Sequence, residues 1–170
     1  MSQIDAYSGA TIFDGEHRHE GAVLLVQNGQ VLGVVPEARI PPDCTQHILD
    51  GGLLAPGFVD LQVNGGGGVL FNERPDVEAI STICAAHARF GTTSLLPTLI
   101  TDTPQIRDAA LQAGIAAAKA EQPGFLGLHL EGPHLSIARK GAHDPALIRP
   151  MSDADLSCIK QARQSLPFLM

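Results

Sequence analysis

The apolar residues of the first third of the chain occur in short runs rather than at helical spacing. Two runs rich in Val and Leu, at residues 22–27 and 30–35, are separated by Asn28-Gly29. This dipeptide readily supplies the two positive φ angles of a tight hairpin turn, so the pattern predicts a β-hairpin. Together with the run at residues 10–13, it predicts a small antiparallel β unit.

From residue 53 onward, short apolar runs alternate with segments of helical spacing. We expect strands at residues 53–63, 92–99 and 125–130, helices at 76–90, 103–120 and 152–165, and the start of another strand at 166–170. Thr103 and Ser152 are suitable N-caps for the second and third helices. The alternation is typical of a parallel sheet. We therefore expect a β portion at 1–52 and βα units at 53–170.

Two architectures are compatible with three βα units and the start of a fourth. One is a small domain with an open parallel sheet. The other is the first part of a (β/α)₈ barrel, which typically needs about 250 residues. The pattern indicates the second, in a chain that ends before its barrel is complete.

Composition and charge narrow the class of protein. With 44% hydrophobic residues the 170-residue chain can form a core, and a net charge of -7 with 11 Lys and Arg argues against nucleic-acid binding. A small anionic ligand stays compatible with this charge, because a few cations and backbone N–H groups are enough to bind one phosphate. The sequence contains neither a membrane span nor a secretory signal. Three cysteines without CxxC spacing fit a reducing compartment, so we expect a cytoplasmic protein.

The candidate chemistry lies just after the predicted parallel strands, because their carboxyl ends meet at one edge of the sheet. Glu131 ends the strand at 125–130 and precedes Gly132-Pro133. A carboxylate there could bind Zn²⁺ or a similar ion. The alternative is a structural carboxylate that forms an ion pair with Arg139 or caps a turn. The residues that follow the two earlier strands, in chain order, are Asp60, Gln62, Asn64, Thr98 and Thr101.

The histidines near Glu131 in the sequence are expected to have different roles. His143 lies in a Gly-Ala-His-Asp-Pro loop, where we expect it to be exposed and able to contact a substrate hydroxyl or phosphate. His129 is inside a strand and reads as a core residue or a neighbour of the site, and His134 as a solvated loop residue. The glycines at 65–68 either approach an anion through backbone N–H groups or form a turn.

Four separate motifs carry a resemblance to a known family. Residues 55–65 (APGFVDLQVNG), 96–101 (LPTLIT), 127–133 (GLHLEGP) and 140–145 (KGAHDP) resemble the N-acetylglucosamine-6-phosphate deacetylases of the amidohydrolase superfamily. The resemblance runs in order along essentially the whole chain. It implies a metal-dependent (β/α)₈ barrel preceded by a small β-sandwich, and hydrolysis of the acetamide of N-acetylglucosamine 6-phosphate to glucosamine 6-phosphate and acetate.

The resemblance also implies roles for single residues. Glu131 corresponds to the metal ligand, and Ala142 and His143 correspond to substrate contacts. Where many amidohydrolases have His-x-His, this chain has Gln62 and Asn64, which are poor metal ligands. We expect them to support a site with one divalent ion, zinc by preference, with iron or manganese open.

The family's two histidine ligands and catalytic aspartate lie on later strands, so this chain contains no catalytic residue. We expect it to be inactive by itself, as a fragment of an enzyme. Two other functions stay open: a non-catalytic domain that binds a sugar phosphate or another chain, and an amidohydrolase acting on a cyclic amide. The expected partner is the small-molecule substrate, with no nucleic acid or membrane, and homo-oligomerisation is open.

Overall fold

The structure, a computed structural model, describes residues 3–170 as two compact units. The first ends at Pro56 and the second spans Gly57–Met170. We expected the division at residues 52/53. It lies later because β7 (Leu53–Leu54) pairs with β2 (Thr11–Phe13) of the first unit. The single strand expected at 53–63 was therefore wrong: Pro56-Gly57 interrupts it, and only β8 (Phe58–Val63) belongs to the second unit.

The first unit contains two sheets. One has the order β5-β4-β1-β6 and the other β3-β2-β7. The predicted hairpin is confirmed by β4 (Ala22–Gln27) and β5 (Gln30–Pro36), with Asn28 and Gly29 at φ 52° and 75°. The remaining strands are β1 (Ile4–Ser8), β3 (Arg18–His19) and β6 (Thr45–Ile48). A short 3₁₀ helix, η1 (Glu37–Arg39), lies between β5 and β6.

The antiparallel unit expected from residues 10–13 and 22–35 is confirmed for the β4–β5 hairpin, but the first unit also contains two parallel pairs. β1 pairs with β6 in parallel, as β2 does with β7. A parallel pair needs a long connection between its strands, and here the β4–β5 hairpin lies within that connection. The short runs in the sequence do not reveal such a pairing.

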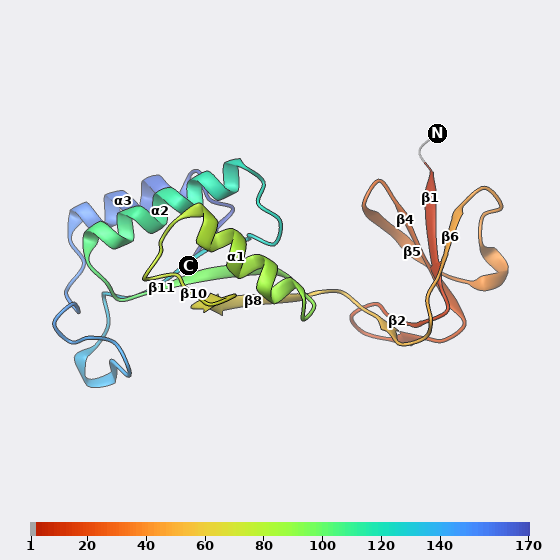
Figure 1. Ribbon diagram of the computed structural model, residues 1–170, viewed down its shortest axis with the longest axis horizontal. Helices are drawn as coiled ribbons and strands as arrows, with labels where there is room; N and C mark the ends of the chain where they lie inside the picture. Colours follow the sequence, from red (N-terminus) through yellow and green to blue (C-terminus); the bar gives the residue numbers. More distant parts are fainter. Residues whose placement is uncertain (1–2) are drawn as a thin grey trace. The chain divides into compact units, whose positions relative to one another are not determined.

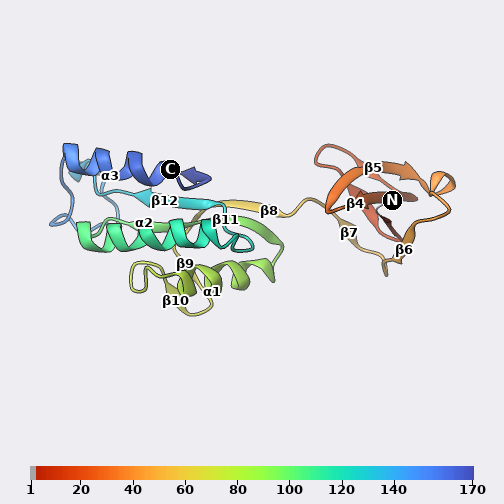
Figure 2. The same cartoon turned by 90° about the horizontal axis from the view of Figure 1, so that it is seen from above.

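The second unit has a four-stranded parallel sheet with the order β13-β12-β11-β8. Beside β8 it contains β11 (Thr92–Ile100), β12 (Gly127–Glu131) and β13 (Phe168–Leu169). The helices α1 (Val77–Ala88), α2 (Pro104–Lys119) and α3 (Asp153–Arg163) connect successive strands and lie along one face of the sheet (Figures 1 and 2). The unit is therefore a mixed α/β fold built of successive βα units.

Side-chain caps start all three helices. Asp76, Thr103 and Ser152 each accept a hydrogen bond from a backbone N–H in the first turn of α1, α2 and α3, respectively. Such a bond satisfies a donor that the helix itself leaves unpaired. The caps predicted at Thr103 and Ser152 are confirmed.

The main core lies between the sheet and the three helices. It contains fifteen buried apolar residues, among them Leu95, Leu111 and Leu128. Gly114 allows α2 to pack closely on β12, because a Cβ at this position would collide with the Leu128 side chain. Burial of these side chains is the dominant stabilising contribution in the unit.

Apolar side chains also remain exposed along the edge strands. Among residues 3–170, β8 and β13 each have a neighbouring strand on one side only. Phe58 and Val59 on β8 are 70% and 59% exposed, and Phe168 on β13 is 55% exposed. Unpaired edges with apolar side chains are ready positions for further strands.

None of the helices within residues 3–170 has the length and apolarity needed to cross a membrane.

Candidate functional site

A cavity of about 520 Å³ opens at the carboxyl ends of β8, β11 and β12. Parallel strands bring their carboxyl ends to one edge of a sheet, which is where ligands usually bind in such folds. All five residues predicted for the site line this cavity: Gln62, Asn64, Glu131, Ala142 and His143. The rest of the lining comes from the end of β11 and from the loop after β12: Ile100, Leu135, Arg139, Lys140 and Gly141.

Glu131, the last residue of β12, has both carboxylate oxygens next to polar groups of the site. Gln62 Nε2 donates to Oε2 at 3.0 Å, and His143 Nε2 lies 3.4 Å from Oε1. The side chain is 30% exposed. Glu131 therefore contacts His143 rather than forming the ion pair considered with Arg139. Its carboxylate is held in place and stays accessible from the cavity.

The expectation that His143 is exposed was wrong, because Thr101 holds its ring in a buried position. The residue is 9% exposed, and its Nδ1 lies 2.8 Å from Thr101 Oγ1. The backbone N–H of Thr101 donates to the same nitrogen at 3.4 Å. A nitrogen that accepts from an N–H carries the lone pair, so Nε2 carries the proton of the neutral ring. This arrangement directs a donor at Glu131.

Gly132 makes room for this arrangement. Its φ is +100°, and a Cβ would collide with Thr101 Oγ1. The Thr101 hydroxyl oxygen also lies 3.4 Å from the Glu131 backbone carbonyl oxygen. The turn after β12 therefore brings Thr101, Glu131 and His143 together because glycine follows Glu131.

The loop between β12 and α3 forms one wall of the cavity. It contains the short 3₁₀ helix η2 (Ile137–Arg139), followed by a turn in which His143 N–H donates to the Lys140 carbonyl at 3.1 Å. Lys140 Nζ donates to the carbonyl oxygens of Gly141 and His143, both at 3.2 Å. Lys140 thus stabilises the turn that presents Ala142 and His143.

Beyond this turn, the loop ends at a buried carboxylate. Asp155 in α3 is 4% exposed at its side chain and is paired with Arg149 and Arg107. Ser152 N–H and Oγ donate to Asp155 Oδ2 at 2.8 and 2.7 Å. The hydrogen bonds from Arg149, followed by those from Ser152 and Arg107, hold the pKa of Asp155 well below its usual range. The carboxylate is therefore charged and links the loop to α2 and α3.

Other residues singled out in the sequence lie beside the site rather than in it. His129 Nδ1 lies 3.3 Å from the buried Thr98 hydroxyl, and Asp60 Oδ1 accepts from Gln62 N–H at 3.1 Å. His134, expected to be solvated, is half-buried, and its Nδ1 lies 3.0 Å from the Arg149 carbonyl. The Cys84 thiol is buried, which raises its pKa to about 11, so this cysteine is a core residue.

The glycine run forms a hairpin. The strands β9 (Gly65–Gly66) and β10 (Val69–Leu70) are antiparallel, and the turn residues Gly67 and Gly68 both have positive φ. His87 of α1 bonds to the Gly65 carbonyl at 3.0 Å. The structure favours the turn over the anion-binding alternative.

Sequence reasoning missed Asn72 and the two arginine partners of Asp155. Asn72 Nδ2 donates to the Ile100 carbonyl and to Asp102, and Asn72 Oδ1 accepts from Ile100 N–H at 3.1 Å. These bonds fix the carboxyl end of β11 next to the cavity. The sequence contains no local signal for them, because the partners are about 30 residues apart.

The donors present in this chain fit part of a metal site. The accessible carboxylate of Glu131 can provide one ligand. Residues 3–170 contain no group of three or more His, Cys, Asp or Glu side chains that could hold an ion. A catalytic zinc needs about three protein ligands, so further ligands would have to come from outside the described residues.

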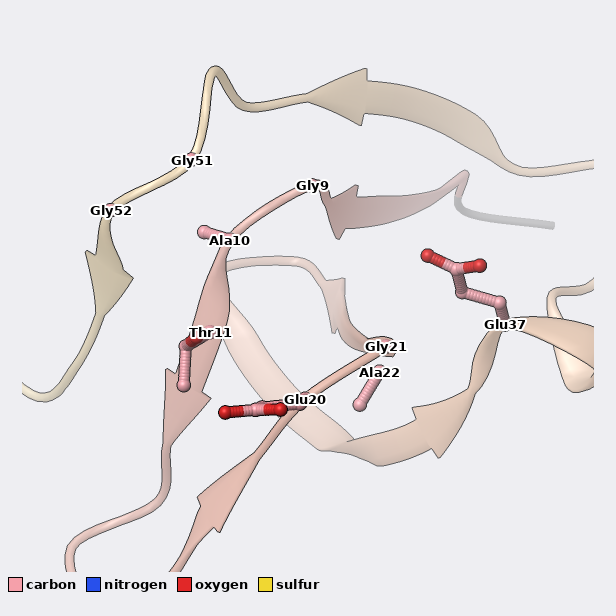
Figure 3. A pocket seen from close by; sticks show the side chains of 9 residues that line it. All are labelled: Gly9, Ala10, Thr11, Glu20, Gly21, Ala22, Glu37, Gly51 and Gly52. Carbon is pink, nitrogen blue, oxygen red and sulfur yellow. The ribbon is translucent and has the colours of Figure 1, made fainter.

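Another hollow, of about 390 Å³, belongs entirely to the first unit (Figure 3). Backbone at Gly9, Gly21, Gly51 and Gly52 forms much of its lining, and Glu20 and Glu37 contribute exposed carboxylates. Its lining includes no histidine, cysteine or cation. The cavity at β12, which combines a carboxylate, a histidine and cations, is therefore the better candidate for a functional site.

Comparisons with known proteins agree on one family. Residues 53–166 match the amidohydrolase family. N-acetylgalactosamine-6-phosphate deacetylase of Shewanella sp. (strain ANA-3) is 38% identical over 149 residues, which cover 86% of this chain and 38% of that protein. N-acetylglucosamine-6-phosphate deacetylase of Haemophilus influenzae is 36% identical over 129 residues, covering 75% of this chain and 34% of that protein.

Solved structures show the same relationship. The crystal structure of N-acetylglucosamine-6-phosphate deacetylase from Pasteurella multocida matches 98% of this chain with a TM-score of 0.90 and 30% identity. A Mycobacterium smegmatis enzyme in complex with N-acetyl-D-glucosamine-6-phosphate matches 99% with a TM-score of 0.79 and 25% identity. The matches cover 44% and 42% of those chains. This chain thus spans about two fifths of the relatives it resembles.

Proposed function

This chain belongs to the amidohydrolase family, and we propose that it forms the amino-terminal part of a deacetylase of N-acetylglucosamine 6-phosphate. The products would be glucosamine 6-phosphate and acetate. The observation that carries the proposal is the position of Glu131 at the end of β12, accessible from a cavity whose wall contains Ala142 and His143. The names of the relatives support the same reaction.

Under this proposal the second unit is the first part of a (β/α)₈ barrel. Support comes from the parallel sheet, from the βα order and from the exposed apolar residues on the edge strands β8 and β13. The first unit would be part of a small β-sandwich. Further βα units would pair with these edges and contribute the missing metal ligands and the catalytic aspartate.

Family members generally depend on a metal ion, and Glu131 would be its one ligand in this chain. When bound, such an ion polarises a carbonyl and lowers the pKa of a water molecule to about 7. Gln62 already occupies Glu131 Oε2 with a hydrogen bond, which supports a site with one ion rather than two. Zinc suits a site completed by imidazole ligands, and iron and manganese are the alternatives.

Within this chain, binding and orientation of the substrate fall to the loop at 140–143. His143 presents Nε2–H next to Glu131, where it can donate to an oxygen of the substrate. The backbone at Ala142 and the cations Arg139 and Lys140 line the same cavity. The positive charge and backbone of this wall suit a phosphorylated sugar.

A second candidate substrate is N-acetylgalactosamine 6-phosphate, because the Shewanella relative, at 38% identity, is named for it. The two sugars differ only in the configuration at C4.

The decisive experiment measures acetate release from both sugar phosphates by a polypeptide that contains this chain and the later βα units. Unphosphorylated N-acetylglucosamine and a cyclic ureide serve as controls. Glu131→Gln should lose bound metal and activity together, while normal metal content in a folded variant would refute its role as ligand. His143→Ala should chiefly raise KM.

The alternative of a non-catalytic binding domain predicts a different result. In that case the 170-residue chain would bind N-acetylglucosamine 6-phosphate without added metal, and the longer polypeptide would release no acetate. Calorimetric titration with and without zinc separates the two functions.

A further inference from the structure

The loop that carries Lys140, Ala142 and His143 is closed where its two ends meet. Arg149 N–H donates to the Pro133 carbonyl at 3.1 Å. The Arg149 carbonyl lies 3.0 Å from His134 Nδ1, within reach of a hydrogen bond from the ring. Residue 149 therefore connects the end of the loop to its beginning, directly after Glu131-Gly132.

The side chain of Arg149 connects this closure to the helical layer. Its Nη1 and Nη2 donate to the two oxygens of Asp155 at 2.5 and 2.6 Å. Paired bonds between a guanidinium and a carboxylate fix both direction and distance. Asp155 is itself fixed, because Ser152 donates to it twice and Arg107 of α2 pairs with it from another element.

Arg107 and Arg149 thus share one carboxylate but serve different segments. Arg107 is 12% exposed and lies within α2, remote in sequence from the loop. Arg149 is 33% exposed and belongs to the loop. Removal of either arginine takes one cation from Asp155, but only Arg149 connects this carboxylate to the loop.

We propose that Arg149 and Asp155 are positioning residues that hold the β12–α3 loop in the arrangement that places His143 next to Glu131. The inference concerns the reaction only through the proposed function, on which its kinetic consequence rests. A loop ordered before the substrate arrives reduces the conformational entropy lost on binding. Loss of the Arg149–Asp155 pair should therefore weaken substrate binding more than it slows the chemical step.

The first test follows the loop itself in the 170-residue chain by limited trypsin digestion. Trypsin cleaves after Arg139 and Lys140, which lie inside the loop, and Pro150 protects the bond after Arg149. In Arg149→Gln we expect cleavage at these two sites to be about tenfold faster than in wild type, because cleavage follows the population of the open loop. Arg107→Gln is the matched control and should leave that rate within about twofold.

The second test compares KM and kcat in the longer polypeptide. Arg149→Gln should raise KM about tenfold and leave kcat within about twofold. Arg107→Gln should change neither. Arg149→Lys should give an intermediate KM, because lysine keeps the charge but cannot form the paired bonds.

Equal digestion rates in wild type and Arg149→Gln would overturn the inference, as would equal increases in the two arginine variants. Digestion at all basic sites would reveal global unfolding of Arg149→Gln, and Arg149→Lys then replaces it in both tests. If the wild-type polypeptide releases no acetate, the proposed function fails, while the digestion rates still decide whether Arg149 holds the loop.

Discussion

In the second unit fifteen apolar residues form one buried cluster between the sheet and its helices, whereas the buried cluster of the first unit has three members, Ala6, Val23 and Leu25. The first unit also leaves Val31 and Ile48 64% and 80% exposed. Because burial of apolar surface dominates folding stability, we expect the core of the second unit to contribute more to the unfolding free energy than that of the first.

The largest expected effect tests that core. Leu128 is fully buried and contacts Gly114 of α2. Leu128→Ala should lower the unfolding free energy by about 4 kcal/mol, since it leaves a cavity between β12 and α2. Urea unfolding followed by circular dichroism measures the change. The control Val31→Ala in the first unit should change it by less than about 0.5 kcal/mol, and similar losses in both would contradict the comparison.

A somewhat smaller effect concerns charge rather than apolar burial. Asp155→Asn leaves Arg107 and Arg149 near a neutral amide and should cost about 3 kcal/mol at neutral pH. The pKa of Asp155 is lower in the folded chain than its unfolded value near 4. Below about pH 4 the unfolded chain therefore binds a proton that the folded chain does not, and stability falls as pH falls.

Measuring the unfolding free energy between pH 6 and pH 2 checks that stability falls as pH falls. Asp155→Asn should make this fall less steep. Within residues 3–170 the first unit also contains a carboxyl of this kind: a hydrogen bond from the His17 backbone N–H and one from the His19 side chain lower the pKa of Asp14. Asp14→Asn should flatten only the signal of the first unit. A steeper fall in Asp155→Asn would contradict the assignment.

The third effect compares two glycines with similar backbone angles. Gly132 and Gly15 have φ of +100° and +108°, but a Cβ at Gly132 would collide with Thr101 Oγ1, whereas nothing lies within 4 Å of one at Gly15. Gly15→Ala should cost about 1 kcal/mol from backbone strain, and Gly132→Ala about 2 kcal/mol because Thr101 must move as well. Thermal unfolding measures both changes, and equal costs would mean that the cavity tolerates movement of Thr101.

The smallest effect is expected at the open edge of the sheet. Phe58 on β8 is 70% exposed, so Phe58→Ser should change the unfolding free energy of the 170-residue chain by less than about 0.5 kcal/mol. It should also increase the monomeric fraction in size-exclusion chromatography, because it removes an exposed apolar side chain. In the longer polypeptide the same substitution should be strongly destabilising, and equal effects in both would argue against pairing at this edge.

Local features of the fold were predictable from the sequence. The Asn28-Gly29 hairpin and the caps at Thr103 and Ser152 depend on residues within a few positions of each other, and their chemistry permits few conformations. Glu131 could be placed at a strand end because an apolar run stops there. Its role as a metal ligand stays a prediction.

The remainder depends on residues far apart in the sequence. His143 is buried because Thr101, 42 positions earlier, holds its ring, and Asp155 is charged and buried because Arg107 comes from another helix. The parallel pairing of β1 with β6 leaves no mark on either strand. Neither periodicity nor composition contains information on such pairings, which the packed chain alone determines.

The exposed edge of β13 has a consequence for how the protein is made. A ribosome synthesises the amino-terminal end first, at about 5–20 residues per second. In a polypeptide of the relatives' length, the next βα unit, proposed to cover Phe168, would leave the ribosome a few seconds after residues 3–170. During that interval a folded βα layer would present an unpaired strand to other nascent chains. We therefore expect chaperone binding during translation to raise the yield of this protein.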